Sequence, residues 1–261
     1  MEKTSIIIPA HNEEKRIAKT LEEYYNFFIE LKKQKKSDFE ILVVLNACKD
    51  NTEKVVKNFS KKYKEILYLN FKRGGKGFAI VEGFKNSLKE KNDFIGFVDA
   101  DMATPPKAFY DLMLNIKDID GIIASRWKKD SVIKTKQTLL RIITSRGFNF
   151  LTRSILFLNY SDTQCGAKLF RKEALKKIIN EIGTTKWAFD IDLLYRLKRK
   201  GCNVKEIPTT WDDQKGSKLN LIKVPFQMFS SIIRLRLFFS PFRFIVKFYD
   251  KLPEKIKIHN L

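Results

Sequence analysis

The sequence predicts an α/β fold in which helices cover a mainly parallel β-sheet. Short runs of β-branched and aromatic residues alternate with longer polar segments, a pattern typical of βαβ units. The chain has 261 residues, of which 44% are apolar, enough for one large or two small domains with a substantial core. Polar and charged residues follow three of the apolar runs directly, at the edge where such sheets bind ligands.

Each element can be placed from the order of apolar and polar residues. Apolar runs predict four strands, at 6–8, 41–45, 66–69 and 94–98. Apolar residues at helical spacing predict helices at 13–31 and 52–63, and the segment 78–88 is also helix-like. Because the carboxyl ends of parallel strands share one edge of the sheet, the polar residues that follow the first, second and fourth strands should meet there.

The composition limits the partners and the catalytic groups that the protein can use. With 51 Lys and Arg against 30 Asp and Glu, the net charge is +21, which calls for nucleic acid, an anionic membrane face or a phosphorylated substrate as partner. Three cysteines, far apart and without a C-x-x-C pair, argue against a disulfide framework and a zinc site. Two histidines leave few routes to a Ser-His or Cys-His pair, so carboxylates, bases other than His or a bound ion must carry any reaction.

Two short motifs follow predicted strands. Asp99 and Asp101 lie two residues apart just after the strand at 94–98, where both carboxylates can face one hard divalent cation that also binds diphosphate oxygens. Alone this pattern is weak, because acidic residues are common in turns. The R-G-G-K-G segment at 73–77 can offer backbone N–H groups and cations to phosphate, or can be a solvated basic turn. It lacks the Walker pattern, which excludes hydrolysis of the P-loop type.

Seven blocks taken together resemble family 2 glycosyltransferases, most closely dolichyl-phosphate β-glucosyltransferases and their archaeal relatives. The most specific blocks are D-T-Q-C-G-A-K-L-F at 162–170 and W-A-F-D-I-D at 187–192. The others lie at 5–14, 73–77, 99–101, 125–126 and 216–219. Their order and spacing agree with the family over residues 4 to 240.

The resemblance implies a GT-A fold, a Mg²⁺ or Mn²⁺ ion, and inverting transfer of a hexose to dolichyl or polyprenyl phosphate. UDP-glucose or UDP-N-acetylglucosamine is the expected donor. Carried over position by position, the resemblance implies that Asp99 and Asp101 bind the metal and that Asp190 and Asp101 are the catalytic residues. The residues expected to bind the nucleotide sugar are Pro9, His11, Glu13, Asn46, Arg73, Lys76 and Asp99. Those expected at the acceptor phosphate are Arg126, Arg141 and Lys218.

Two departures from the family pattern leave questions open. Residues 45–48 read L-N-A-C where most relatives have D-D-G-S, so the identity of the nucleobase is open. Ala103 stands where mannosyl-transferring relatives have Gln, so waters or diphosphate must complete the metal shell.

Asp190 itself allows several roles. It could orient a sugar hydroxyl, steer the acceptor, or act as a base if the acceptor were an alcohol. The alternative is a helix N-terminal carboxylate that satisfies backbone N–H groups. For His11, a turn residue bonded to backbone is the simpler interpretation.

Two amphipathic segments extend the predicted domain. Residues 138–158 form one amphipathic helix, or two joined at Gly147, and a second amphipathic run starts at Pro225 and breaks at Pro241. We therefore expect a GT-A domain at 1–219, with an amphipathic insertion at about 134–160, and a basic tail at 220–261. Either segment could pack on the core or enter a membrane interface.

The membrane interpretation is favoured by charge. Residues 220–261 hold eight Lys and Arg against two Asp and Glu, which suits an anionic leaflet. No window of about 18 uncharged apolar residues occurs, and the N-terminus lacks the pattern of a signal peptide. The expected location is therefore the cytoplasmic face of the cell or endoplasmic reticulum membrane, attached peripherally.

Two other functions stay open. A basic nucleic-acid-binding protein would also carry this charge, although carboxylates at strand ends would repel a polyanion. A family 2 transferase with a soluble acceptor is the nearer alternative. The Q-x-x-R-W pattern of processive polymerases is absent from the sequence, which argues against polysaccharide synthesis.

Overall fold

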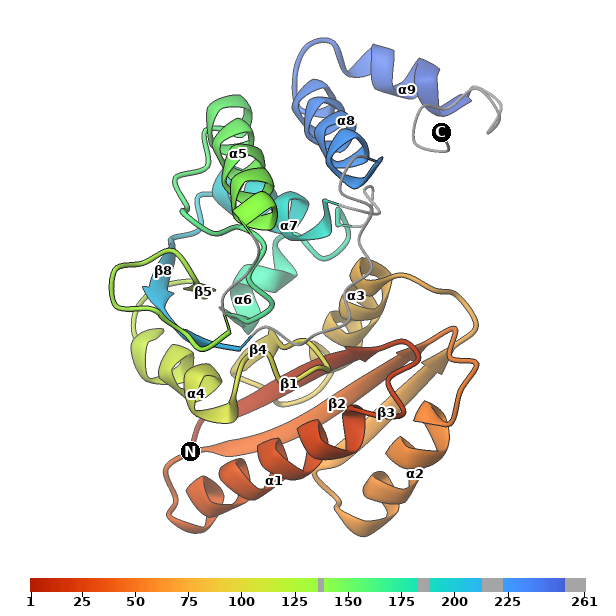
Figure 1. The fold of residues 1–261 in the computed structure, drawn as a ribbon, viewed down its shortest axis with the longest axis vertical. Helices are drawn as coiled ribbons and strands as arrows, with labels where there is room; N and C mark the ends of the chain where they lie inside the picture. The colour runs from red at the N-terminus through yellow and green to blue at the C-terminus, as the bar shows by residue number, and fades with distance from the viewer. Residues whose placement is uncertain (136–138, 183–187, 213–222, 252–261) are drawn as a thin grey trace.

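A seven-stranded sheet forms the centre of the computed structural model, which describes residues 1–135, 139–182, 188–212 and 223–251 (Figure 1). Its strand order is β3-β2-β1-β4-β7-β5-β8. The strands are β1 (Lys3–Ala10), β2 (Asp38–Asn46), β3 (Ile66–Phe71), β4 (Phe94–Phe97), β5 (Gly121–Ser125), β7 (Lys168–Arg171) and β8 (Val204–Pro208). All neighbours are parallel except β7, which runs antiparallel between β4 and β5. The predicted mainly parallel sheet is confirmed.

Helices cover both faces of this sheet. One face carries α1 (Ile17–Lys33), α2 (Thr52–Lys62) and α4 (Pro106–Asn115). The other carries α3 (Lys76–Ser87), α6 (Lys172–Lys176) and α7 (Phe189–Arg199). A two-stranded sheet of β6 (Val132–Ile133) and β9 (Thr210–Trp211) lies apart from the main one. The helix predicted from residue 13 starts four residues later, because a turn closed on the Glu13 carbonyl precedes it.

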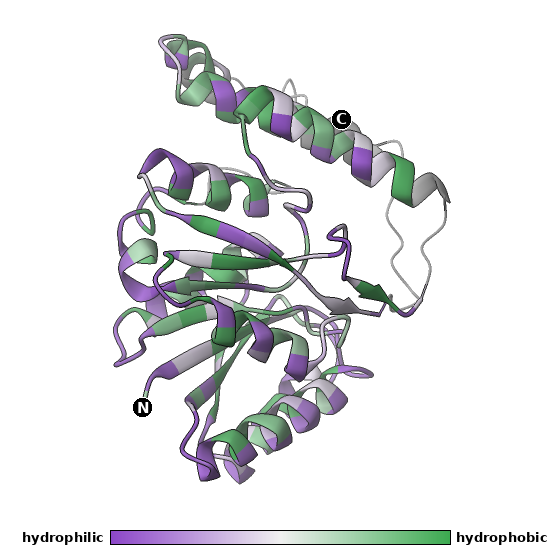
Figure 2. Cartoon of the chain, turned by 90° about the vertical axis from the view of Figure 1, so that its left-hand side faces the viewer, coloured by the Kyte–Doolittle hydropathy of each residue, from purple (hydrophilic) through white to green (hydrophobic). Residues whose placement is uncertain are grey.

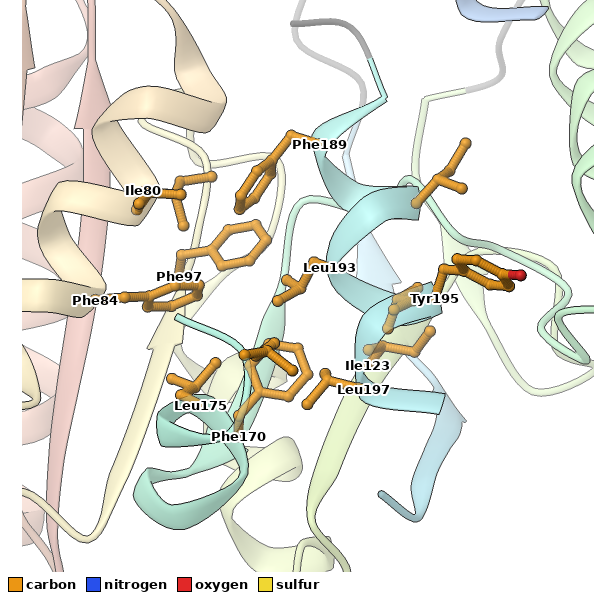
Figure 3. Packing of buried hydrophobic residues seen from close by; sticks show 14 of the residues in the cluster. Ile80, Phe84, Phe97, Ile123, Phe170, Leu175, Phe189, Leu193, Tyr195 and Leu197 are labelled. Carbon is orange, nitrogen blue, oxygen red and sulfur yellow. The ribbon is translucent and has the colours of Figure 1, made fainter. Parts of the chain in front are cut away.

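Side-chain alternation in the strands builds two cores. In β1, Ile6 and Ile8 face the cluster beneath α1, and Ile7 faces the cluster beneath α3. The second cluster joins α3, β4, β7 and α7, with Phe97 between Phe84 and Phe189 at ring-centroid distances of 6.1 and 6.2 Å (Figure 3). This packing fixes the N-terminal end of α7 against the carboxyl end of β4.

Three helices lie at the end of the molecule away from α1 and α2 (Figure 1). They are α5 (Leu139–Leu156), α8 (Lys223–Phe238) and α9 (Arg243–Lys251). The first is one continuous helix through Gly147, and the break predicted at Pro241 separates the other two. In Figure 2 apolar and polar residues are interleaved along this end of the molecule. Among the described residues, no helix combines the length and apolarity needed to span a bilayer.

Candidate active site

Asn46 ties three loops together at the carboxyl edge of the sheet. Its Nδ2 donates to the Ala10 carbonyl (2.9 Å), and its Oδ1 accepts from the Gly75 amide (3.0 Å). His11 Nδ1 donates to the Asn46 carbonyl at 2.7 Å. The Asn46 side chain is buried. Both its NH₂ group and its carbonyl oxygen nevertheless have a hydrogen-bond partner, because a carboxamide can donate and accept at once. The residue that departs from the family pattern therefore holds the 73–77 loop against β1.

An ion pair closes the loop after β1, and α1, which follows that loop, is bonded to the D-A-D turn. Glu13 forms a two-point ion pair with Arg16, with N···O distances of 2.7 and 2.8 Å. Thr20 on α1 donates to the Ala100 carbonyl at 2.7 Å. Pro9 is buried within β1, in register with Val44. Thus the predicted nucleotide-binding residues of β1 share one edge with the carboxylate pair, and the Glu13 carboxylate already has a cationic partner.

Asp99 and Asp101 form the acidic centre of this edge. Lys76 Nζ lies 2.5 Å from Asp99 Oδ1, and the Ala103 amide donates to Asp101 Oδ1 at 3.0 Å. Burial, reinforced by the charge of Asp99, raises the pKa of Asp101 above its ordinary value. Desolvation lowers the pKa of Lys76, but the carboxylates of Asp99, Asp190 and Asp101 outweigh it and raise that pKa. These four charges therefore interact as one group.

The loop before β7 closes on that group. A Cβ built on Gly166 would lie 2.1 Å from Asp99 Oδ2, so this backbone touches the carboxylate where no other residue fits. Asp162 holds the same loop from the other side through Arg126, whose Nε and Nη2 donate to it at 2.7 and 2.9 Å. The D-T-Q-C-G block and the D-A-D block, more than sixty residues apart in sequence, are therefore in direct contact.

Asp190 reaches the site from the first turn of α7. Its Oδ1 accepts from Lys168 Nζ at 2.7 Å, and its charge is one of those that raise the pKa of Lys76. The adjacent Phe189 packs against Gly77, where a Cβ would lie 2.8 Å from the Phe189 Cβ. The W-A-F-D and R-G-G-K-G blocks therefore meet at the same edge of the sheet, and the predicted convergence of motifs is confirmed.

The three cations expected at an acceptor phosphate differ in what the structure shows. The Arg126 guanidinium is largely buried, bonds Asp162, and lies 5.2 Å from the centroid of the Trp211 ring. Arg141 lies in α5, but its side chain is outside the described residues, and so is the whole of Lys218. Among the donor-site candidates, Arg73 makes a cation–π contact with Phe78, with its guanidinium carbon 4.7 Å from the ring centroid.

Two residues of the site escaped the sequence interpretation. Lys168 is fully buried, although lysine is ordinarily a surface residue. Asp162 is buried against Arg126. Both belong to the D-T-Q-C-G-A-K-L-F block, whose resemblance to the family is the signal in the sequence that could have pointed to them.

A divalent ion fits the carboxylate pair. No group of three His, Cys, Asp or Glu side chains gathers into a metal cluster in the part of the chain that the structure describes. Two carboxylates after one strand are nevertheless the usual protein share of a Mg²⁺ shell, with substrate phosphates and waters as the remaining ligands. The donor set is therefore that of a site completed by a phosphorylated substrate.

Known proteins resemble this chain in both sequence and fold. Residues 5–179 match the model described as Glycosyl transferase family 2. The chain belongs to this family. The dolichyl-phosphate beta-glucosyltransferase of Dictyostelium discoideum is 33% identical over 242 residues, 89% of this chain and 73% of the relative. The human enzyme of that name is 32% identical over 251 residues, 89% of this chain and 74% of the relative.

A more distant relative and a solved structure add to these similarities, the structure for the fold alone. Glycosyltransferase AglD of Haloferax volcanii is 28% identical over 88% of this chain and 36% of its own length. Glucosyl-3-phosphoglycerate synthase of Mycobacterium tuberculosis, at 17% identity, superimposes with a TM-score of 0.64 over 90% of this family 2 chain and 80% of its own. The same synthase has been solved with Mn²⁺ and UDP, at a TM-score of 0.63 over 90% of this chain and 79% of its own. The predicted GT-A fold and the glycosyltransferase class are confirmed.

Proposed function

We propose that this family 2 glycosyltransferase moves a hexose from UDP-glucose or UDP-N-acetylglucosamine to a dolichyl or polyprenyl phosphate, with inversion at the anomeric carbon. One observation carries the proposal: Lys76, Asp99, Gly166 and Asp190 come from four separate motifs and meet at one edge of the sheet. The names of the dolichyl-phosphate relatives support the lipid acceptor.

Asp99 and Asp101 would hold a Mg²⁺ or Mn²⁺ ion. Bound there, the ion supplies positive charge to the departing nucleoside diphosphate. The structures of glucosyl-3-phosphoglycerate synthase with Mn²⁺ or Mg²⁺ and UDP support this choice of ion. Gly166 serves the pair by leaving room for the Asp99 carboxylate.

The donor diphosphate would lie between these carboxylates and the 73–77 loop. That loop leads into the N-terminal end of α3, where backbone N–H groups favour anions. Lys76 is half exposed and interacts with three carboxylates, so its ammonium would be able to bind a phosphate oxygen of the donor beside Asp99 and Asp101, the residues that would hold the metal. Asn46 keeps the loop in position through the Gly75 amide.

The acceptor would need orientation more than deprotonation. A phosphate monoester has a second pKa near 6, so at neutral pH it is already a nucleophile and a strong general base is unnecessary. Asp190 would orient the sugar or the acceptor from the first turn of α7, and the Arg126, Arg141 and Lys218 positions would attract the phosphate. Cationic positioning of two anionic reactants is then the main catalytic contribution of the chain.

The helices at the far end of the molecule would attach the enzyme to the membrane. The aromatic side chains most exposed there are Phe150, Phe157, Phe242, Phe244 and Phe248, each at least 56% accessible. The sequence of residues 220–261 also holds eight Lys and Arg. Phenylalanine entering the acyl boundary and cations meeting anionic headgroups are the two ingredients of peripheral attachment. We place this surface on the cytoplasmic face.

A grid of donors and acceptors tests the proposal. Purified protein is incubated with Mn²⁺ and with UDP-glucose, UDP-N-acetylglucosamine or GDP-mannose, against labelled dolichyl phosphate, undecaprenyl phosphate or soluble sugars and phosphosugars. Transfer from a UDP-sugar to a lipid phosphate is the expected result. Transfer only to a soluble acceptor would overturn the lipid assignment, and transfer only from GDP-mannose would overturn the donor.

A further inference from the structure

Lys168 occupies a place where a lysine is costly. It is the first residue of β7 and is in register with Phe97, one strand away from the D-A-D turn. Its exposed fraction is 0%. A buried ammonium loses its hydration and destabilises the fold unless it is paired and hydrogen-bonded. A leucine or methionine would fill this volume at lower cost.

Its contacts point to the site. Lys168 Nζ donates to the Cys165 carbonyl at 2.6 Å and to Asp190 Oδ1 at 2.7 Å, and it lies 5.3 Å from the centroid of the Phe97 ring. Lys168 also contributes to lowering the pKa of Asp162, but that carboxylate pairs with Arg126. Asp190 is therefore the one carboxylate within ion-pair distance of Lys168 in the described part of the chain.

We propose that Lys168 is a positioning residue that fixes the reactive orientation of the Asp190 carboxylate. The bond to Oδ1 directs the other oxygen, Oδ2, toward the reactants. The Asp190 side chain is 18% exposed, and its charge contributes to raising the pKa of Lys76, whose side chain is 44% exposed. One ammonium thus anchors the carboxylate from the core, and a second, more exposed ammonium interacts with it electrostatically.

The surrounding packing makes the anchor rigid. Phe189 lies against Phe97 at 6.2 Å and against Gly77, so the start of α7 is fixed (Figure 3). With the backbone held there, the remaining freedom of Asp190 is rotation of its side chain. A hydrogen bond at 2.7 Å from a fully buried donor removes that rotation. The inference deepens the proposed function and rests on the role given there to Asp190.

Three variants separate position from charge and from stability. Lys168→Met removes the ammonium and keeps the length of the side chain, Lys168→Arg keeps a cation, and Asp190→Asn keeps the shape of the anchored group. We expect Lys168→Met to lower kcat about 100-fold, as a misplaced catalytic group does, with the donor KM within about 2-fold of the parent value. Lys168→Arg should recover at least a tenth of the parent kcat.

A double-mutant cycle provides the decisive readout. If Lys168 acts through Asp190, adding Lys168→Met to Asp190→Asn should lower kcat by less than about 3-fold further. The matched control is Arg196→Met, which breaks a buried pair with Asp192 elsewhere on α7. Like Lys168→Met, Arg196→Met should lower the thermal midpoint, because each removes one partner of a buried ion pair. In combination with Asp190→Asn, however, Arg196→Met should lower kcat by the same factor as it does alone.

Failure of this inference is distinct from failure of the proposed function. A multiplicative cycle, or a loss in Lys168→Met that only follows the folded fraction measured by circular dichroism, overturns the positioning role. Absence of transfer to lipid phosphate by the parent enzyme overturns the acceptor instead. In that case the same cycle is read on hydrolysis of the nucleotide sugar, where water replaces the acceptor and the expected non-additivity is unchanged.

Discussion

Gly166 and Asp99 are in direct contact: a Cβ at position 166 would lie 2.1 Å from Oδ2 and 2.6 Å from Cγ of Asp99. These distances are far below van der Waals separation, so the absence of a side chain at 166 is a condition for the observed position of the carboxylate. The loop before β7 thus forms one wall of the proposed metal site. A change in this loop should act on metal and donor binding before it acts on the fold.

Gly166→Ala should therefore weaken the binding of Mn²⁺ with UDP. Either the Asp99 carboxylate or the loop must move, and overpacking of this kind costs about 1–3 kcal/mol, which corresponds to a loss of about 5- to 150-fold if it falls on binding. Isothermal titration with UDP and Mn²⁺ measures it. In the control Gly147→Ala, the new Cβ meets nothing within 4 Å, so UDP and Mn²⁺ should bind as in the parent. Equal affinities in the two variants would contradict the contact.

Removal of either carboxylate should abolish transfer. Asp99→Ala and Asp101→Ala each delete one proposed metal ligand, and a pair that binds through only two protein ligands cannot lose one without losing the ion. We expect less than about 1% of parental activity with an unchanged circular dichroism spectrum. The control is Asp111→Ala on α4, a carboxylate paired with Lys107 at the surface, which should retain full activity. Undiminished transfer in EDTA would contradict the metal requirement.

The buried pair of Asp162 and Arg126 should make stability depend on pH. Desolvation raises the pKa of Asp162, but Arg126 lowers it more, so the pKa lies below its ordinary value. Such a group stabilises the fold above its unfolded pKa of about 3.9, and the contribution disappears as pH falls through the folded pKa. Asp162→Asn should lower the free energy of unfolding at pH 7 by about 3–5 kcal/mol.

Urea unfolding of the two proteins at several pH values measures this effect. The difference between parent and Asp162→Asn should be constant from pH 7 to about 5 and should shrink below pH 4, where the parent carboxylate takes up its proton. The exposed pair of Glu30 and Lys33 provides the control. Its Glu30→Gln variant should differ from the parent by less than about 1 kcal/mol at any pH. If the difference in the free energy of unfolding between parent and Asp162→Asn did not change with pH, the pair would not be the source of the pH dependence of stability.

The fold followed from the sequence where side-chain periodicity is strong. The runs at 6–8 and 41–45 are fully apolar, as parallel strands buried on both faces must be, and both became strands. The antiparallel strand β7 was missed because K-L-F-R is short and ends in charges. A lysine there reads as a surface residue until its partner, Asp190, is brought close by the fold.

Several members of the candidate site were expected from the sequence, but Lys168, Asp162 and the contacts between the residues were not. Asp99 was expected at this edge because it follows a strand, and Lys76 and Asp190 were expected in the site because of the resemblance to family 2 glycosyltransferases. That Arg126 turns to Asp162 depends on a loop closure over 36 residues, which no local pattern encodes. Likewise, the contact of Gly166 with Asp99 is a property of strand order, since β7 must insert beside β4 before the two can meet.

Attachment to membranes should depend on the exposed aromatics of the C-terminal helices. Phe242, Phe244 and Phe248 are 56%, 62% and 69% exposed, and burying a phenylalanine in an apolar phase is worth up to about 3 kcal/mol. Replacing all three with serine should weaken binding to vesicles of anionic phospholipid at least about 100-fold, since even 1 kcal/mol from each suffices. Flotation across a range of lipid concentrations measures this, with Leu114→Ser on α4, also half exposed, as the control that should bind like the parent. Binding that survives the triple substitution would move the membrane contact to α5 and the residue that follows it, where Phe150 and Phe157 are exposed.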